Sequence, residues 1–208
     1  MEKIVFFGDS YTYGHGLADC LDKNGYGPGP EPSKLGWANL LCNIRNASGR
    51  NLSAPGASNL EILWKMFHTE ISTDEIIIVQ WSFWDRDCLL DDKIFQIGSW
   101  FENSIPYYKV HSNTDMITRN YLNINHGHLW LKQKANPFLM LGNEKNYKEI
   151  DNTDKGWKHF AKLTDDMISP YFSHFWCDMA EDNVHAGPKT NARWAKFVNQ
   201  LLDSKLKG

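Results

Sequence analysis

Two kinds of hydrophobic pattern alternate along the chain: short apolar runs, and longer segments in which apolar residues recur every three or four positions. The short runs predict strands at residues 3–8, 50–53, 75–82 and 136–142. The run at 75–82 has β-branched residues in succession, which is typical of a strand buried on both faces at the centre of a parallel sheet. The longer segments predict helices at residues 35–44, directly after Ser58, and at 115–134, 154–168 and 190–206.

Strands that alternate with helices predict an α/β layer sandwich, with a central, mostly parallel sheet in one domain of residues 1–208. In the helix after Ser58, this serine is the expected N-cap, and Glu61 is its expected capping-box partner. The apolar stripe of that helix is expected to contain Leu60, Leu63, Trp64 and Phe67. The least clear region is 91–136, where only the helix at 115–134 is predicted.

Small polar residues gather where the predicted strands end. Gly8, Asp9 and Ser10 follow the first strand, residues 51–59 follow the second, and residues 182–185 precede the last helix. Ligands bind at the carboxyl ends of the strands in open α/β sheets. The three loops are therefore the candidate site.

The residues of these loops can form a nucleophile and its activating groups. A serine hydroxyl needs a base to take its proton, and the histidine base needs a partner that fixes its tautomer. Ser10 is the predicted nucleophile, His185 the base, and Asp182, three residues earlier in the same loop, the group that orients His185. The backbone N–H groups of Ser10 and Gly56 are the predicted oxyanion donors, since glycine lets the backbone approach a ligand closely.

These motifs resemble those of the SGNH (GDSL-type) hydrolases. The first block of that family stands here as residues 8–10, the second as residues 51–59 with Gly56, and the last, Asp-x-x-His, as residues 182–185. The resemblance implies a flavodoxin-like three-layer fold and metal-independent ester hydrolysis through an acyl-enzyme, with no cofactor. The segment at 11–20 and a tryptophan-rich third block suggest a subgroup found in phage and bacterial proteins.

The third block departs from the family pattern. The family has Gly-x-Asn-Asp after the third strand, and its asparagine is a third oxyanion donor. Here residues 80–86 read Gln-Trp-Ser-Phe-Trp-Asp-Arg, and Ser82 falls where the asparagine is expected. Ser82 is therefore the predicted third donor, with Arg86 or Gln80 as alternatives. Loss of one oxyanion donor costs about 2.7–4 kcal/mol of transition-state stabilisation.

The predicted activity is removal of small acyl groups, such as acetyl, from carbohydrate or small esters. A non-catalytic glycan-binding or virion structural module on the same fold is an alternative, supported by the altered third block. An acyltransferase or a thioesterase is another. The nine tryptophans either fill the core or line a sugar-binding groove.

Charge and composition limit the kinds of binding partner and the cellular location that the sequence predicts. The net charge is −3 and no block of Lys or Arg occurs, so neither predicts a nucleic-acid partner. The four cysteines lack Cys-x-x-Cys spacing and are expected to be free thiols of a reducing compartment. No leader or membrane-spanning run is apparent, which predicts a cytoplasmic protein, or a virion-associated one released by lysis if phage-encoded, without membrane partners. The oligomeric state stays open.

Two histidine features are candidates for other roles. His126 and His128 form a close pair, but no third ligand has metal-site spacing, so no metal is predicted. His15 lies near Ser10 in sequence and is a candidate for lining the substrate site, without an assigned role.

Overall fold

The centre of the molecule is a four-stranded parallel sheet. A computed structural model describes residues 1–143, 167–168 and 170–207. The strand order is β2-β1-β3-β6, with bounds Ser48–Asn51, Lys3–Phe7, Glu75–Trp81 and Phe138–Gly142. Lys3 lies opposite Ser48 on one side and opposite Glu75 on the other. All residues of β3 are buried, which confirms the prediction of a central strand.

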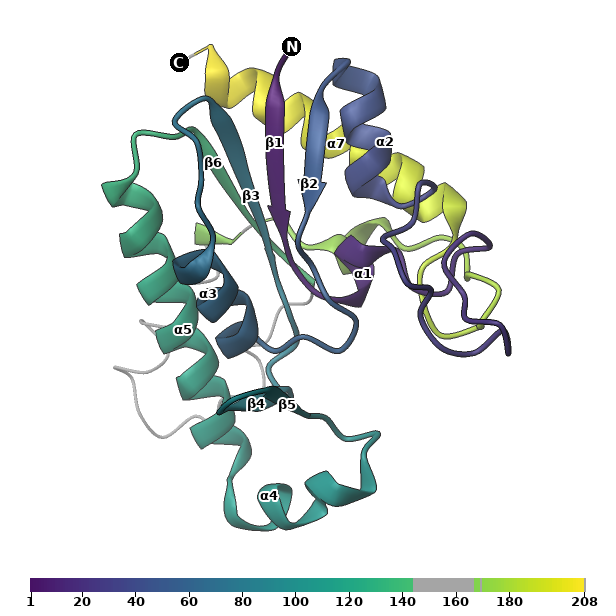
Figure 1. Ribbon diagram of the computed structural model, residues 1–208, viewed down its shortest axis with the longest axis vertical. Coiled ribbons are helices and arrows are strands. Elements are labelled where there is room, and N and C mark those ends of the chain that lie inside the picture. The colour runs from purple at the N-terminus through teal and green to yellow at the C-terminus, as the bar shows by residue number, and fades with distance from the viewer. Residues whose placement is uncertain (144–166, 169, 208) are drawn as a thin grey trace.

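Helices cover both faces of this sheet and make it the middle of three layers (Figure 1). On one face lie α2 (Trp37–Arg45) and α7 (Pro188–Leu206), and on the other α3 (Asn59–His68) and α5 (Asn113–Gln133). Alternate residues of β1 serve the two cores. Ile4 packs in the core with α2 and α7, and Val5 packs in the core with α3 and α5. The predicted fold class is confirmed. The helix predicted at 154–168 falls mostly outside the described residues.

The helix α3 is rotated relative to the predicted apolar stripe. Its N-cap is Ser58 as predicted, because Ser58 Oγ accepts a hydrogen bond from the Glu61 N–H at 3.2 Å. Ile62 and Met66 are fully buried in the core, however, whereas Trp64 is 36% exposed and Phe67 48% exposed. The stripe prediction was wrong in this part because the helix carries two apolar rows and the aliphatic one faces the sheet. The larger rings lie outside, where Trp64 stacks on His68.

The poorly patterned region contains an antiparallel hairpin and short helices. The hairpin consists of β4 (Asp87–Leu90) and β5 (Ile94–Ile97), and it is followed by η1 (Glu102–Ser104) and α4 (Ile105–Val110). In Figure 1 this insertion lies beyond the edge to which the arrows of the parallel strands point. It therefore lies at the carboxyl edge of the sheet, where the candidate site was expected.

Two further short helices flank the site region, α1 (Ser10–Tyr13) and η3 (Phe172–Phe175). The four cysteines are free, and three of them are buried. Among the described residues, no helix has the length and apolar character that crossing a membrane requires.

Candidate active site

Ser10 lies at the point where the central strand β1 turns into α1. Asp9 caps this helix, because its Oδ1 accepts the N–H of Tyr11 at 3.1 Å. Gly8 lets the turn close, since a Cβ at that position would lie 2.3 Å from Thr12 Oγ1. Ser10 is only 2% exposed, and its Oγ is enclosed without a hydrogen-bond partner among the described residues. An enclosed hydroxyl without a partner is uncommon in proteins and calls for a functional explanation.

The second loop is hydrogen-bonded to this turn. The Ala54 N–H donates to the Gly8 carbonyl at 3.1 Å, and Asn51 Nδ2 donates to the Thr12 carbonyl at 2.9 Å. Gly56 follows at a φ of 76°, in the left-handed region that favours glycine. In the part of the chain that the structure describes, the N–H groups of Ser10 and Gly56 donate no hydrogen bond. Both are therefore available to a ligand, as the oxyanion-hole prediction requires.

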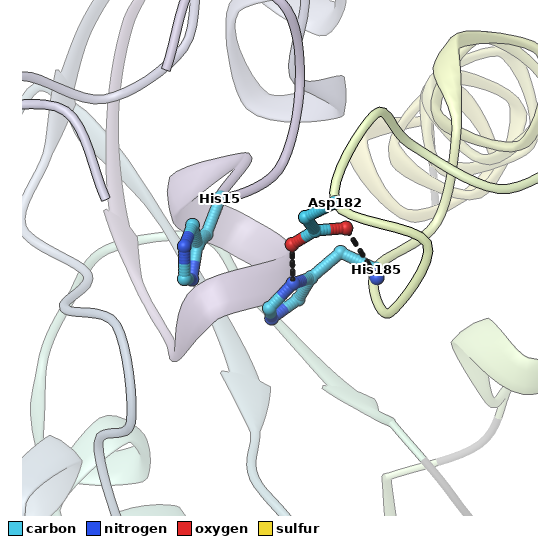
Figure 2. Close-up of side chains that lie close together, drawn as sticks. All are labelled: His15, Asp182 and His185. Carbon is cyan, nitrogen blue, oxygen red and sulfur yellow. Dashed lines mark hydrogen bonds and ion pairs between the residues drawn. The ribbon is translucent and has the colours of Figure 1, made fainter. Parts of the chain in front are cut away.

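Asp182 and His185 form a hydrogen-bonded pair within the third loop (Figure 2). His185 Nδ1 lies 2.6 Å from Asp182 Oδ2, and Asp182 Oδ1 accepts the N–H groups of Val184 and His185, each at 3.0 Å. Burial raises the pKa of Asp182, but these hydrogen bonds outweigh it and leave the pKa below its ordinary value. The ionised carboxylate accepts the Nδ1–H proton, so Nε2 of the neutral ring carries the free lone pair.

The third loop packs against the end of α1. The Glu181 N–H donates to the Gly16 carbonyl at 3.0 Å, and a Cβ at Gly16 would lie 2.5 Å from Asp182 Oδ2. The ring of Tyr11, next to Ser10, lies 5.3 Å from the His185 ring between centroids. The structure thus brings together the loops that the sequence predicted to converge. Ser10 Oγ and His185 are not hydrogen-bonded in this conformation, and such contacts often tighten only when a substrate binds.

Comparison with solved structures places this arrangement in a known fold. A putative lipolytic protein of the G-D-S-L family from Desulfitobacterium hafniense is 12% identical, with a TM-score of 0.55 over 97% of this chain and 99% of that one. An acetyl xylan esterase from Butyrivibrio proteoclasticus is 15% identical, with a TM-score of 0.59 over 99% and 64%. The chain has the SGNH hydrolase fold.

Other solved structures with a similar fold are equally distant in sequence. A carbohydrate esterase family 2 enzyme from Corynascus thermopiles, solved with its carbohydrate-binding domain, is 12% identical, with a TM-score of 0.61 over 100% of this chain and 67% of that one. The chain thus spans about two thirds of each of these two carbohydrate esterases. No family model and no curated protein matches the sequence. The likeness is therefore one of fold.

Ser82 lies in the site of this SGNH fold, but its hydroxyl donates elsewhere. Its Oγ donates to Asp9 Oδ2 at 2.8 Å and accepts from Arg86 Nη1 at 3.1 Å. Asp9 Oδ2 also accepts from Arg86 Nη1 and from Asn143 Nδ2, each at 2.7 Å. The role of Ser82 as an oxyanion donor stays a prediction. In this structure its hydroxyl proton is used in the hydrogen bond to Asp9. Gln80 Nε2 is likewise engaged, with Asn143 Oδ1.

His15 is the site residue whose contact the sequence did not reveal. Its ring lies 4.4 Å from that of His185 between centroids, beside the Asp182 pair (Figure 2). One potential metal-ligand cluster occurs among the described residues. It consists of His15, Asp182 and His185, each of which offers one atom within 4.8 Å of the others. Asp182 and His185 already bond to each other, and His15 Nε2 lies 3.4 Å from the Tyr26 carbonyl, so these groups are engaged within the protein. The pair His126 and His128 forms no such group.

Protonation of His15 is expected to weaken folding. Burial, and then the neighbouring His185, lower the pKa of His15 below its ordinary value. The unfolded ring therefore binds its proton at a higher pH than the folded ring, so stability falls as the pH drops below about 6.5. We expect His15→Gln to lose less unfolding free energy than the parent between about pH 7.5 and about pH 5. Urea denaturation at both values measures this, and equal losses would contradict it.

Gly56→Ala is expected to strain the second loop. A left-handed non-glycine residue costs about 1–2 kcal/mol, and the new Cβ would also lie 2.6 Å from Gln96 Oε1. Gly25→Ala is the matched control, because Gly25 has a φ of 78° and nothing within 4 Å of its Cβ position. We expect Gly56→Ala to lower the urea midpoint more than Gly25→Ala and to slow the ester hydrolysis that is proposed below. Equal midpoints with full activity would contradict this role of Gly56.

Proposed function

We propose that this chain is a serine ester hydrolase that works through an acyl-enzyme. The observation that carries the proposal is the Ser10 hydroxyl, which is enclosed and has no partner among the described residues, next to a loop in which the Asp182 carboxylate fixes the His185 tautomer. These are the groups that nucleophilic catalysis requires. Structural relatives of this fold include esterases and lipases, which supports the reaction class.

The residues would divide the reaction in the following way. Nε2 of His185 takes the proton from Ser10 Oγ, and Oγ bonds to the acyl carbon. The carbonyl oxygen becomes an oxyanion, which the N–H groups of Ser10 and Gly56 hold. His185 then returns its proton to the leaving alcohol, and water releases the acid by the same steps. Asp182 stabilises the imidazolium that forms in each half-reaction.

The proposed substrates are small acyl esters, such as acetyl groups on carbohydrates. Two of the relatives are carbohydrate esterases, one of them an acetyl xylan esterase. A cavity of about 200 Å³ lies beside Tyr11, and its aromatic walls include Phe83, Phe172 and Trp176. Aromatic rings stack on sugar faces, so this cavity supports a carbohydrate over a long lipid chain.

Acetate release separates this function from its alternatives. The full chain is assayed with p-nitrophenyl acetate and with acetylated xylo-oligosaccharide, each with and without a second alcohol as acceptor. Release of acetate into water supports the hydrolase. Preferential transfer to the alcohol indicates an acyltransferase instead. Binding of the oligosaccharide without acetate release from either ester would contradict the proposal and favour a binding module.

A further inference from the structure

We propose that Arg86 takes the place of the asparagine that the third block lacks, and that its guanidinium stabilises the oxyanion formed on the ester. The inference rests on the proposed ester hydrolysis and adds a residue to that site. Three observations carry it: where the guanidinium is held, which donors it leaves unpaired, and how the competing side chains are engaged.

The guanidinium is fixed between aromatic rings at the carboxyl edge of the sheet. Arg86 Cζ lies 4.6 Å from the centroid of the Phe83 ring and 4.9 Å from that of Trp100. Nη1 forms an ion pair with Asp9 at 2.7 Å, and the side chain is 11% exposed. A cation held this way is preorganised, which is the condition for strong electrostatic stabilisation of a transition state.

The same contacts connect Arg86 to residues that lie beside the two predicted backbone donors. Asp9, its ion-pair partner, directly precedes Ser10 and caps the helix that Ser10 begins. Trp100, on its other side, packs on the second loop, since a Cβ at Gly56 would lie 3.5 Å from Trp100 Cζ2. Arg86 therefore contacts Asp9, which directly precedes the predicted donor Ser10, and Trp100, which lies beside the predicted donor Gly56.

The guanidinium keeps N–H donors that none of the described residues accepts. Nη1 serves Asp9 and Ser82, whereas Nε is enclosed and has no hydrogen-bond partner among the described residues. Nη2 also makes no hydrogen bond there, so the Nε–Nη2 edge, which suits anionic oxygen, is unoccupied. The Asp9 carboxylate also accepts hydrogen bonds from Tyr11 N–H, Ser82 Oγ and Asn143 Nδ2, so Arg86 is one of several donors to it.

The competing side chains are engaged elsewhere. The Ser82 hydroxyl donates its only proton to Asp9. The Gln80 amide donates to Asn143, and the Gln80 atom left unpaired is Oε1, an acceptor that cannot stabilise an anion. Of the three side chains named for this role from the sequence, Arg86 is the one with an enclosed nitrogen that makes no hydrogen bond among the described residues.

Kinetics of Arg86→Gln test the proposal, with Arg119→Gln as the control. Arg119 is 47% exposed and pairs with Asp87 and Asp115, not with Asp9. We expect Arg86→Gln to lower kcat on p-nitrophenyl acetate about 100-fold with little change in KM, because one oxyanion donor is lost. Ser82→Ala should lose less than this, Arg86→Lys should lie between the parent and Arg86→Gln, and Arg119→Gln should match the parent.

Inhibition by a phenylboronic acid distinguishes stabilisation of the oxyanion from a structural role. Ser10 Oγ bonds to the trigonal boron, its proton passes to His185, and the boron becomes a tetrahedral anion that resembles the transition state. We expect Arg86→Gln to weaken this inhibition by about the same factor as kcat/KM. An unchanged kcat, or a lower kcat with undiminished inhibition, would overturn the proposal.

The outcomes separate this inference from the proposed function. An active parent with a fully active Arg86→Gln overturns the role of Arg86 and leaves ester hydrolysis intact. A parent that neither cleaves esters nor binds the boronic acid contradicts both. If Arg86→Gln does not fold, Arg86→Lys decides: we expect a lower kcat together with weaker inhibition by the boronic acid, and a kcat and inhibition equal to those of the parent would overturn the proposal.

Discussion

Replacement of Ser10 by alanine is expected to lower kcat/KM for p-nitrophenyl acetate by at least about 10⁴-fold, because the nucleophile is removed. The fold should survive, since Ser10 Oγ makes no hydrogen bond to any residue that the structure describes. Equal thermal midpoints for the parent and the variant would show this. The activity that remains reports only the backbone donors and the binding of the ester.

The matched control for Ser10→Ala is Ser204→Ala. Ser204 lies on α7 and its hydroxyl donates to the Gln200 carbonyl, so its loss should leave the rate unchanged. Equal rates for the parent and Ser10→Ala would show that hydrolysis, if present, comes from another group. Free cysteines or surface lysines would then be the sites to examine.

Asp182→Asn is expected to lower kcat about 10⁴-fold. The amide oxygen can still accept the N–H groups of Val184 and His185, so the loop should keep its shape. The neutral amide can no longer stabilise the imidazolium, and its NH₂ group would favour the wrong tautomer of His185. Stopped-flow measurement of the first turnover shows whether acylation itself is slowed.

Asp178→Asn is the matched control for this variant. Asp178 lies four residues earlier, and its carboxylate accepts the N–H groups of Lys189 and Thr190 at the start of α7. We expect it to cost stability but little activity. Similar rate losses in both aspartate variants would contradict the assignment of Asp182 as the group that orients His185.

Asp182 should also make folding depend on pH. The pKa of Asp182 is lowered in the folded chain, so its contribution to stability is complete above the unfolded value of about 3.9 and is lost as the pH falls through the lower folded value. The parent should therefore be more stable than Asp182→Asn at neutral pH. The difference should shrink below about pH 3.9.

The sheet and its order of elements could be predicted because its signals are local. The strand β3 is buried along its whole length, and an apolar β-branched run is evident in the sequence itself. The face of α3 could not be predicted in the same way, since Ile62 and Met66 compete with Trp64 and Phe67 for the core. Which of the two pairs is buried depends on the space between the sheet and α5, which the local sequence does not specify. The hairpin at 87–97 lacks a clear alternating pattern, and its Leu89 and Phe95 are exposed.

The candidate site shows the same division between local and distant contacts. Asp182 and His185 are three residues apart, so their pairing could be predicted from spacing alone. The direction of the Ser82 hydroxyl depends on Asp9, 73 residues away, and no spacing rule indicates that bond. The contact of His15 with His185 likewise crosses almost the whole chain. The sequence thus predicts which loops meet, whereas the direction of each hydrogen bond follows from the packing.

The central claim is that Ser10 is a nucleophile activated by His185, and covalent labelling tests it most directly. The full chain is treated with a fluorophosphonate, and intact mass and peptide mapping locate the adduct. We predict one adduct per chain, on the peptide that contains Ser10, with none in Ser10→Ala and much slower labelling in His185→Ala. Ester hydrolysis without an adduct at Ser10, or labelling of another residue at the same rate in Ser10→Ala, would contradict the account.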